Sequence, residues 1–510
     1  MIDVLFISPG NTDKIYQELA KKYTTIEPPT WSLLLAEACR SKGNSVAILD
    51  INAENLSDEE VYLRVMDLDP RLVVFVVYGQ NVNAGTVSMS GAVKSSKDLK
   101  DRGINCPIAF IGSHVQALPK KTLEEEQSID FAFTNEGVYA LTNLLDSAFF
   151  GNDTLYKTKG IVWRSPTGVV INKAEFVVPQ DRMDIDLPGY AWDLLPYDVK
   201  PLDLYRSPMW HANYDESKRS PYAAIQTSLG CKFGCGFCMI NMINRNDEDE
   251  IGVASNYSNM RHWSTEFIIK EFDKLNALGV KTIKITDELF LLNKKFYVPL
   301  CEKLAEREYS KDLLMWAYSR IDTVRDPEAL NLLKRAGIKW LALGIESADK
   351  NVRLEVSKGK FEDVDITKVI KQVEEAGIHV MANYIFGLPG DSKESMEKTL
   401  KFSQELNTVG WNAYAAMALP GSDLYRDAVI SGKELPTSYD GYSFLSYNTT
   451  PVANDNLTSA EILRFRDEAF AKYHTSSEFT KLITDTFGET QAMNVEKMTY
   501  IKLKRRLLGD

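Results

Sequence analysis

The stretch of sequence that decides the fold is SLGCKFGCGFCMI, residues 228–240, which places Cys231, Cys235 and Cys238 within eight residues. A structural zinc site takes four ligands, usually as two separated pairs, and the chain's other cysteines lie far away and singly. Three thiolates on one short loop instead suit a four-iron cluster in which one iron has no protein ligand. We therefore predict a 4Fe-4S cluster on these cysteines, with one iron open to an exogenous chelator.

Length and charge limit the class of protein. The 510 residues exceed one ordinary domain, and a composition of 44% apolar and 25% charged residues is typical of a globular protein. The net charge of −12 disfavours non-specific binding to nucleic acid. No apolar run is long enough to span a membrane, and the acidic start at Asp3 is unlike a signal peptide. We therefore expect a cytoplasmic protein, where clustered cysteines indicate a metal site.

Repeated helix–glycine–strand patterns follow the cysteine loop. ALGVKTIKI (277–285), RAGIKWLAL (335–343) and EAGIHVMANY (375–384) each end a helix at glycine and open a strand with a β-branched residue. Such βα units predict a full or partial barrel with its chemistry at the carboxyl ends of the strands. The repeat stops near residue 431, so we expect residues 431–510 to form a small, mostly helical cap.

Strands and helices also alternate over residues 1–150. This alternation predicts an α/β domain with a parallel, doubly wound sheet and a ligand crevice beyond the carboxyl ends of its strands. A dinucleotide site would need Gly-x-Gly-x-x-Gly after the first strand, and SPGNTDKIY (8–16) has one glycine, which excludes it. Residues 151–220 change character, because GIVWRSPTGVVINK (160–173) predicts a hairpin and the proline-bearing remainder predicts a linker rather than a core.

The cysteine loop resembles that of radical S-adenosylmethionine (SAM) enzymes, in which the amino acid part of SAM chelates the fourth iron. Later segments resemble that family's motifs in the right order: ITDELFLLN (285–293), YSRID (318–322), LGIES (343–347), YIFGLPGDS (384–392) and ALPGSDLY (418–425). The resemblance implies a partial (β/α)6 radical SAM barrel over residues 221–430 and cleavage of SAM to a 5′-deoxyadenosyl radical. It also implies SAM contacts from Phe237, Asp287, Glu288, Arg320 and Glu346.

The N-terminal half resembles the Rossmann-like cobalamin-binding domain that precedes the radical domain in one large subgroup. Segments 27–55 and 110–137 carry this resemblance. The Asp-x-His-x-x-Gly signature that supplies a histidine to cobalt is absent, which implies cobalamin without a protein histidine on the metal. A degenerate domain that keeps the fold and binds nothing is the alternative. The implied cobalamin contacts are Tyr78, Gln80, Asn81, Gly112, Ser113, His114, Asn135, Glu136 and Gly137.

Both resemblances together imply a cobalamin-dependent radical SAM methyltransferase of the class B type. The radical would remove a hydrogen from an unactivated carbon of a small-molecule substrate, and methylcobalamin would deliver the methyl group. An electron donor such as flavodoxin or ferredoxin would reduce the cluster. Aromatic residues expected around the substrate are Trp210, His211, Tyr214, Tyr384, Tyr414, Tyr442 and Tyr447.

Three alternatives to methyl transfer stay open. The same cofactors could drive ring contraction or cyclisation, and the motifs do not separate these reactions. A tRNA-modifying methylthio-type enzyme would need three further cysteines near the N-terminus and a basic RNA domain, which Cys39 and Cys106 do not supply. A non-catalytic cobalamin or redox sensor would need no intact site for cleaving SAM.

Overall fold

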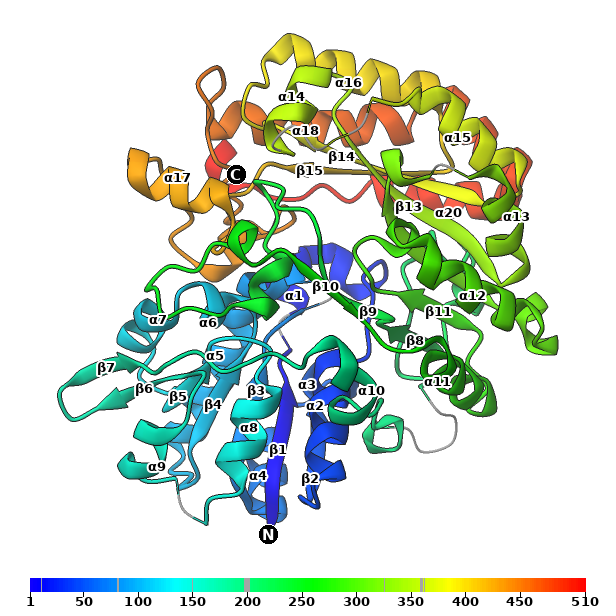
Figure 1. Ribbon diagram of the computed structural model, residues 1–510. Helices are drawn as coiled ribbons and strands as arrows, with labels where there is room; N and C mark the ends of the chain where they lie inside the picture. The colour runs from blue at the N-terminus through cyan, green and yellow to red at the C-terminus, as the bar shows by residue number, and fades with distance from the viewer. Residues whose placement is uncertain are drawn as a thin grey trace.

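The computed structural model describes residues 1–10, 12–79, 82–148, 150–196, 202–324, 326–357, 361 and 363–510. Figure 1 shows two α/β units, with the N-terminal sheet below, the second sheet above it and the C-terminal helices over the outer side of the second sheet. Among the described residues, every helix is too short or too polar to cross a membrane.

The N-terminal unit is built on a seven-stranded sheet in the order β2-β1-β3-β4-β5-β6-β7. Its first five strands are parallel, as the alternating pattern predicted. β6 and β7 form the predicted hairpin, which pairs antiparallel with β5 and extends the sheet. The first sheet therefore continues past residue 150. The strands are β1 (Ile2–Ser8), β2 (Val46–Asp50), β3 (Pro70–Val76), β4 (Ile108–Ile111), β5 (Phe131–Phe133), β6 (Ile161–Ser165) and β7 (Gly168–Ile171).

Helices cover both faces of this sheet because the side chains of its strands alternate. Val4 and Phe6 of β1 pack on the side of α2 (Thr30–Ser41) and α8 (Val138–Leu145). Leu5 and Ile7 point the other way, into a separate apolar cluster with α4 and α5. The remaining helices of this unit are α1 (Thr12–Tyr16), α3 (Ile51–Glu54), α4 (Asp58–Leu68), α5 (Gly85–Asp101), α6 (Ser113–Ala117), α7 (Pro119–Glu125) and α9 (Asn152–Lys157).

The second unit is a six-stranded parallel sheet in the order β15-β14-β13-β12-β11-β8, which confirms a partial barrel with β8 and β15 as its two edges. Its strands are β8 (Tyr222–Ile225), β11 (Thr282–Ile285), β12 (Leu314–Arg320), β13 (Ile338–Glu346), β14 (His379–Phe386) and β15 (Gly410–Ala415). The connecting helices are α11 (Thr265–Ala277), α12 (Lys294–Ala305), α13 (Pro327–Arg335), α14 (Lys350–Val356), α15 (Ile366–Glu375) and α16 (Lys393–Leu406).

The two units share one apolar core. The larger cluster of buried residues runs from α2 and α8 through residues 183–195 and 202–214 into the barrel. The prediction that the segment before the barrel is only a connection is therefore wrong, since Trp192 and Tyr205 of this segment are at most 3% exposed. Its short helix is α10 (Met183–Asp186). Beyond the barrel lie the helices α17 (Asp423–Ser431), α18 (Ser459–His474), α19 (Ser477–Phe487) and α20 (Glu489–Thr499), as expected for a helical cap.

Candidate functional site

The three clustered cysteines lie on a loop that leaves β9 (Ser228–Cys231), a strand paired antiparallel with β10 (Asn259–His262). Asn241 holds the start of this loop, because its Oδ1 accepts the Cys231 N–H at 2.8 Å and its Nδ2 donates to the Phe233 carbonyl at 3.0 Å. The Gly236 N–H donates to the Val356 carbonyl at 2.7 Å, which ties the middle of the loop to α14. The loop is thus fixed at both points by residues of the second unit itself.

The cysteine thiols suit a cluster rather than a single ion. Burial raises the pKa of Cys231 to about 12 and that of Cys235 to about 11, so either thiolate needs a nearby positive charge to form. A single zinc ion in a structural site takes four protein ligands. Three cysteine thiolates on one loop are instead the donor set of a four-iron cluster with one open iron. Bound iron would supply the positive charge that these buried thiolates lack.

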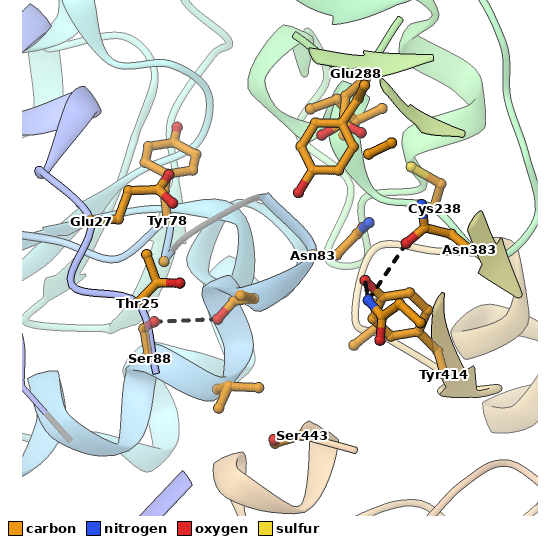
Figure 2. A pocket seen from close by; sticks show the side chains of 18 of the residues that line it. Thr25, Glu27, Tyr78, Asn83, Ser88, Cys238, Glu288, Asn383, Tyr414 and Ser443 are labelled. Carbon is orange, nitrogen blue, oxygen red and sulfur yellow. Dashed lines mark hydrogen bonds between the residues drawn. The ribbon is translucent and has the colours of Figure 1, made fainter. Parts of the chain in front are cut away.

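A cavity of about 600 Å³ lies between the two α/β units and is lined by all three cysteines. Ser8, Asp50 and Tyr78, at the carboxyl ends of β1, β2 and β3, form part of one wall. Residues of the barrel form the opposite wall. The carboxyl ends of the two parallel sheets therefore face each other, and these are the ends where such folds bind ligands. Figure 2 shows Tyr78, Glu27 and Ser88 on one side and Cys238, Glu288 and Tyr414 on the other.

Of the residues implied for SAM, Phe237, Glu288, Arg320 and Glu346 line this cavity. The Arg320 guanidinium lies 4.0 Å from the Phe233 ring centroid and 4.7 Å from that of Phe361, and it pairs with Asp322 at 2.5 Å. Burial raises the pKa of both Glu288 and Glu346 to about 7, against the opposing charges of Lys284 and Arg320. Two carboxyls with raised pKa values beside a cysteine loop are suited to bind a cation.

The backbone at Glu346 is strained. Its φ is +65°, and the register between β13 and β14 shifts between Gly344 and Glu346. A Cβ on Gly344 would lie 2.4 Å from Oε1 of Glu346, so a side chain at position 344 would push the Glu346 carboxyl out of its present place. Non-glycine residues with positive φ and β-bulges both gather at functional sites, where they redirect a side chain. Here the strain turns the carboxyl of Glu346 into the cavity.

Asp287 differs from its neighbour Glu288, because its carboxylate bonds other parts of the protein, and its contact with SAM stays a prediction. The Asp287 carboxylate accepts the Thr227 N–H at 2.6 Å, the Thr227 hydroxyl at 2.7 Å and the Ser228 hydroxyl at 2.5 Å. It is 3% exposed and lies outside the residues that line the cavity. Asp287 therefore anchors the strand that leads to Cys231.

Of the residues implied for cobalamin, Tyr78 lines the cavity and stacks on Trp31 with centroids 4.8 Å apart. Gln80 and Asn81 lie outside the described residues. Asn83, which sequence reasoning missed, lies on the cavity wall beyond them and accepts the Met239 N–H at 3.1 Å. This contact joins the N-terminal unit directly to the residue after Cys238.

Gly112, Ser113 and His114 lie at the end of β4, away from the cavity wall. A Cβ on Gly112 would lie 2.1 Å from the Val77 carbonyl oxygen, so this glycine is needed for close packing between strands. The His114 ring is 6% exposed, contacts the Thr86 hydroxyl at 3.1 Å and has a pKa lowered to about 3 by burial. His114 is therefore a neutral, buried side chain in this structure, and its contact with cobalamin stays a prediction.

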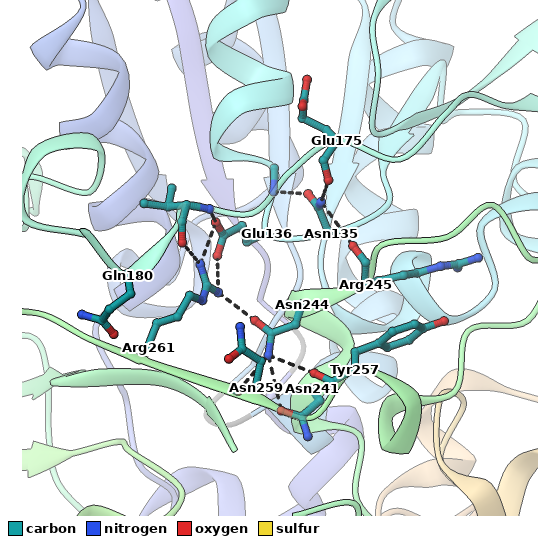
Figure 3. Close-up of polar contacts among 12 residues, drawn as sticks. Asn135, Glu136, Glu175, Gln180, Asn241, Asn244, Arg245, Tyr257, Asn259 and Arg261 are labelled. Carbon is teal, nitrogen blue, oxygen red and sulfur yellow. Dashed lines mark hydrogen bonds and ion pairs between the residues drawn. The ribbon is translucent and has the colours of Figure 1, made fainter. Parts of the chain in front are cut away.

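Asn135, Glu136 and Gly137 follow β5, and the structure turns the first two toward the barrel rather than toward the cavity (Figure 3). Glu136 forms a buried ion pair with Arg261 at 2.7 Å, and Asn135 donates to the Arg245 carbonyl at 3.3 Å. The Asn135 side chain also accepts the Gly137 N–H at 3.0 Å. Asn135 and Glu136 thus form a contact between the two units, and a cobalamin contact from Asn135, Glu136 or Gly137 stays a prediction.

The aromatic residues predicted around the substrate divide in the same way. Trp210, Tyr414 and Tyr442 line the cavity. Buried contacts elsewhere hold His211, Tyr214 and Tyr384, and Tyr447 is exposed.

Polar residues that the sequence analysis did not single out also line the cavity, namely Glu27, Lys284, Asn383 and Asn412. A lysine in a strand buried along its whole length, TIKI of β11, was the signal for Lys284.

Two family models match the chain: the B12 binding domain over residues 18–145 and the radical SAM superfamily over residues 225–403. An uncharacterized methyltransferase of Pyrococcus horikoshii is 26% identical over 467 residues, which cover 91% of each chain. An anaerobic magnesium-protoporphyrin IX monomethyl ester cyclase of Cereibacter sphaeroides is 24% identical over 452 residues, which cover 86% of this chain and 65% of the cyclase.

Among solved structures, the radical SAM methyltransferase TsrM of Kitasatospora setae, with tryptophan substrate and a SAM analogue bound, superposes with a TM-score of 0.66. The sequences are 15% identical, and the match covers 100% of this chain and 97% of that one. The likeness shows that the whole chain has the same fold.

Proposed function

Because the chain belongs to the radical SAM enzymes that carry a B12-binding domain, we propose that it methylates an unactivated carbon of a small polar molecule. One observation carries this proposal: a single cavity is lined by the cluster cysteines on one side and by Tyr78 and Trp31 of the B12-binding domain on the other. A substrate in that cavity would lie between the two cofactor sites. Holding reactants in this way supplies a large part of catalysis when the chemistry belongs to the cofactors.

The bound cofactors would supply a 5′-deoxyadenosyl radical for hydrogen abstraction and a methyl group on cobalt. The protein's part is to hold and orient them. Cys231, Cys235 and Cys238 would hold the cluster, and Glu288 and Glu346 would face the cationic groups of SAM. Arg320, fixed by Asp322 and stacked on Phe233, would fill the space beside the cluster loop.

Several polar side chains in the cavity lining support a substrate with polar groups. Lys284 forms a buried ion pair with Glu27 at 2.9 Å, and Asn383 and Asn412 face each other in register on β14 and β15. Buried charges and amides that meet an apolar ligand lose their hydration without gaining hydrogen bonds, which is costly. We therefore propose a substrate with hydrogen-bonding groups, in preference to a hydrocarbon.

Ring formation without methyl transfer is the second candidate, and the magnesium-protoporphyrin cyclase relative favours it. The two reactions differ in where the methyl group of SAM goes. In protein reconstituted anaerobically with iron, sulfide and cobalamin, methyl-labelled SAM should place its label in the product during methyl transfer. Product without label would support ring formation. A Cys235→Ala variant should lose both the cluster iron and the cleavage of SAM, and retention of both would contradict the proposed site.

We also propose that a small electron-transfer protein, such as flavodoxin or ferredoxin, reduces the cluster in a reducing cytoplasm. The support is the cluster chemistry, because a low-potential iron–sulfur centre needs an external donor. The enzyme assignment removes the sensor alternative, since the family match spans the domain that cleaves SAM.

A further inference from the structure

A chain of buried polar side chains runs from the B12-binding domain to the cluster loop (Figure 3). It consists of Glu136, Arg261, Asn244 and Asn241, and we call these four residues the relay. Glu136 follows β5 of the N-terminal sheet, whereas Arg261 lies on β10 and both asparagines lie on the segment after the cysteine loop. The relay therefore crosses between the two units at a place distinct from the cavity.

The first link is the ion pair between the units. Arg261 Nη2 donates to Glu136 Oε2 at 2.7 Å and Nη1 donates to Oε1 at 3.2 Å, with both side chains at most 3% exposed. The Val178 carbonyl accepts from Arg261 Nη1 at 2.6 Å, and the Val178 N–H donates to Glu136. This two-point geometry fixes both the distance and the angle between the groups.

The second link leads from Arg261 to the cysteine. Nη2 of Arg261 also donates to Asn244 Oδ1 at 2.8 Å, and Asn244 Nδ2 donates to Asn241 Oδ1 at 3.4 Å. The same oxygen of Asn241 accepts the Cys231 N–H at 2.8 Å. A Cβ on Gly230 would lie 2.6 Å from Asn244 Nδ2, so the backbone beside Cys231 leaves room for this contact.

The other end of the network reaches the cavity. Gln116 donates from Nε2 to the Asn135 carbonyl at 2.6 Å and to the hydroxyl of Tyr78, a residue of the cavity wall. The Glu136 N–H donates to the Ile243 carbonyl at 3.1 Å. Contacts therefore continue from Tyr78 on the cavity wall through Gln116 to Asn135 and Glu136. From Glu136 the other relay residues lead to Cys231.

We propose that Glu136, Arg261, Asn244 and Asn241 are positioning residues that fix the cluster loop at a set distance and angle from the cobalamin side of the cavity. The inference rests on the proposed function. Stability alone gives little reason to keep such a pair, because a buried ion pair costs about as much desolvation as it returns in attraction. The best attested role of such pairs is to fix how two parts of a molecule align with each other.

The test measures the geometry directly. Cob(II)alamin and the reduced cluster are both paramagnetic, so pulsed electron paramagnetic resonance of the full-length, reconstituted protein reports their dipolar coupling. We expect the double variant Glu136→Gln/Arg261→Met, which removes both charges together, to broaden or shift this coupling. We expect SAM cleavage per methyl group transferred to rise roughly tenfold, since small misplacements of reacting groups have large effects on rate.

The matched control is Asp467→Asn/Arg505→Met. Arg505 is 1% exposed and makes a two-point pair at 2.8 Å with Asp467, which is 28% exposed, between the cap and its tail. This control should leave the dipolar coupling unchanged. Equal changes in both double variants would overturn the proposal, because they would indicate a general loss of rigidity. An unchanged coupling and cleavage ratio in folded Glu136→Gln/Arg261→Met would overturn it as well.

A gentler variant covers the case in which the double variant does not fold. Arg261→Lys keeps the charge, but an ammonium lacks the planar fork that spans Glu136 and Asn244 together. We expect an intermediate broadening of the coupling, and a spectrum identical to wild type would contradict the proposal. Wild-type protein that binds the cluster but no cobalamin would instead remove the proposed function, and this inference with it.

Discussion

Glu27 of the B12-binding domain and Lys284 of the barrel form an ion pair in the cavity lining, with both carboxylate oxygens 2.9 Å from Nζ. The Lys284 and Glu27 side chains are 3% and 8% exposed. Nζ also lies 5.2 Å from the Trp316 ring centroid and 5.6 Å from that of Tyr318. The pair therefore both joins the two domains and lines the cavity between them.

Removing one partner of this pair should destabilise the protein strongly. Lys284→Met leaves Glu27 buried without its cation, which costs about 3–5 kcal/mol for a buried pair. The double variant Glu27→Gln/Lys284→Met should recover most of that loss, because no charge is then left unpaired. Denaturant unfolding of both single variants and the double variant gives the coupling energy. If both single variants lost the same stability and the double variant recovered none of it, the loss could not be assigned to an unpaired buried charge.

Binding of SAM should depend on pH. Burial raises the pKa of Glu288 and Glu346 to about 7, above the 4.5 of a free glutamate. A cationic ligand prefers the ionised carboxyls, so affinity should fall as the pH drops from 8 to 6 and level off above that range. Equilibrium binding of SAM to the reconstituted protein across this range measures the effect. A Glu346→Gln variant should bind more weakly and show a shallower dependence, and an unaltered profile would exclude Glu346 as a contact.

Gly344→Ala should damage the site more than the fold. The new methyl group would lie 2.4 Å from Glu346 Oε1, and this side chain can move away at modest cost. We expect a small loss in melting temperature together with a rise of about tenfold in the dissociation constant for SAM, equivalent to roughly 1.4 kcal/mol. Calorimetric melting and SAM titration separate the two effects. Unchanged SAM affinity with a large loss of stability would show that the strain at Glu346 serves packing alone.

The architecture was predictable because it depends on local signals. Apolar runs and helix-ending glycines such as Gly337 locate the strands of both sheets, and three cysteines in eight residues need no tertiary information. The direction of a side chain after a strand is a different matter. Glu136 follows β5 as Tyr78 follows β3, yet only Tyr78 reaches the cavity, because Arg261 of the other unit attracts Glu136 away from it.

Contacts distant in sequence were equally hidden. Glu27 and Lys284 are separated by 257 residues, and neither carries a local pattern that names the other. The segment before the barrel was predicted as a linker on the strength of its prolines, but apolar side chains such as Trp192 bury it in the shared core. Proline content reports on backbone regularity and says nothing about burial.

The sequence alone does not show which of the adjacent acids Asp287 and Glu288 faces the cavity. The structure gives them separate places, and this difference can be tested. Asp287 accepts three hydrogen bonds from Thr227 and Ser228, so Asp287→Ala would leave buried donors unpaired at about 1–3 kcal/mol for each lost partner. Glu288 faces the cavity, and Glu288→Gln should weaken SAM binding with little change in the free energy of unfolding.

The two variants should therefore give opposite patterns when unfolding and SAM binding are measured on the same preparations. Asp287→Ala should lower stability and iron retention, since Asp287 anchors the strand that carries Cys231, while any protein that keeps its cluster binds SAM normally. Glu288→Gln should keep its iron and lose affinity for SAM. If Asp287→Ala instead lost SAM affinity at full iron content, the Asp287 carboxylate would have to turn into the cavity, and its three bonds to Thr227 and Ser228 would break on binding.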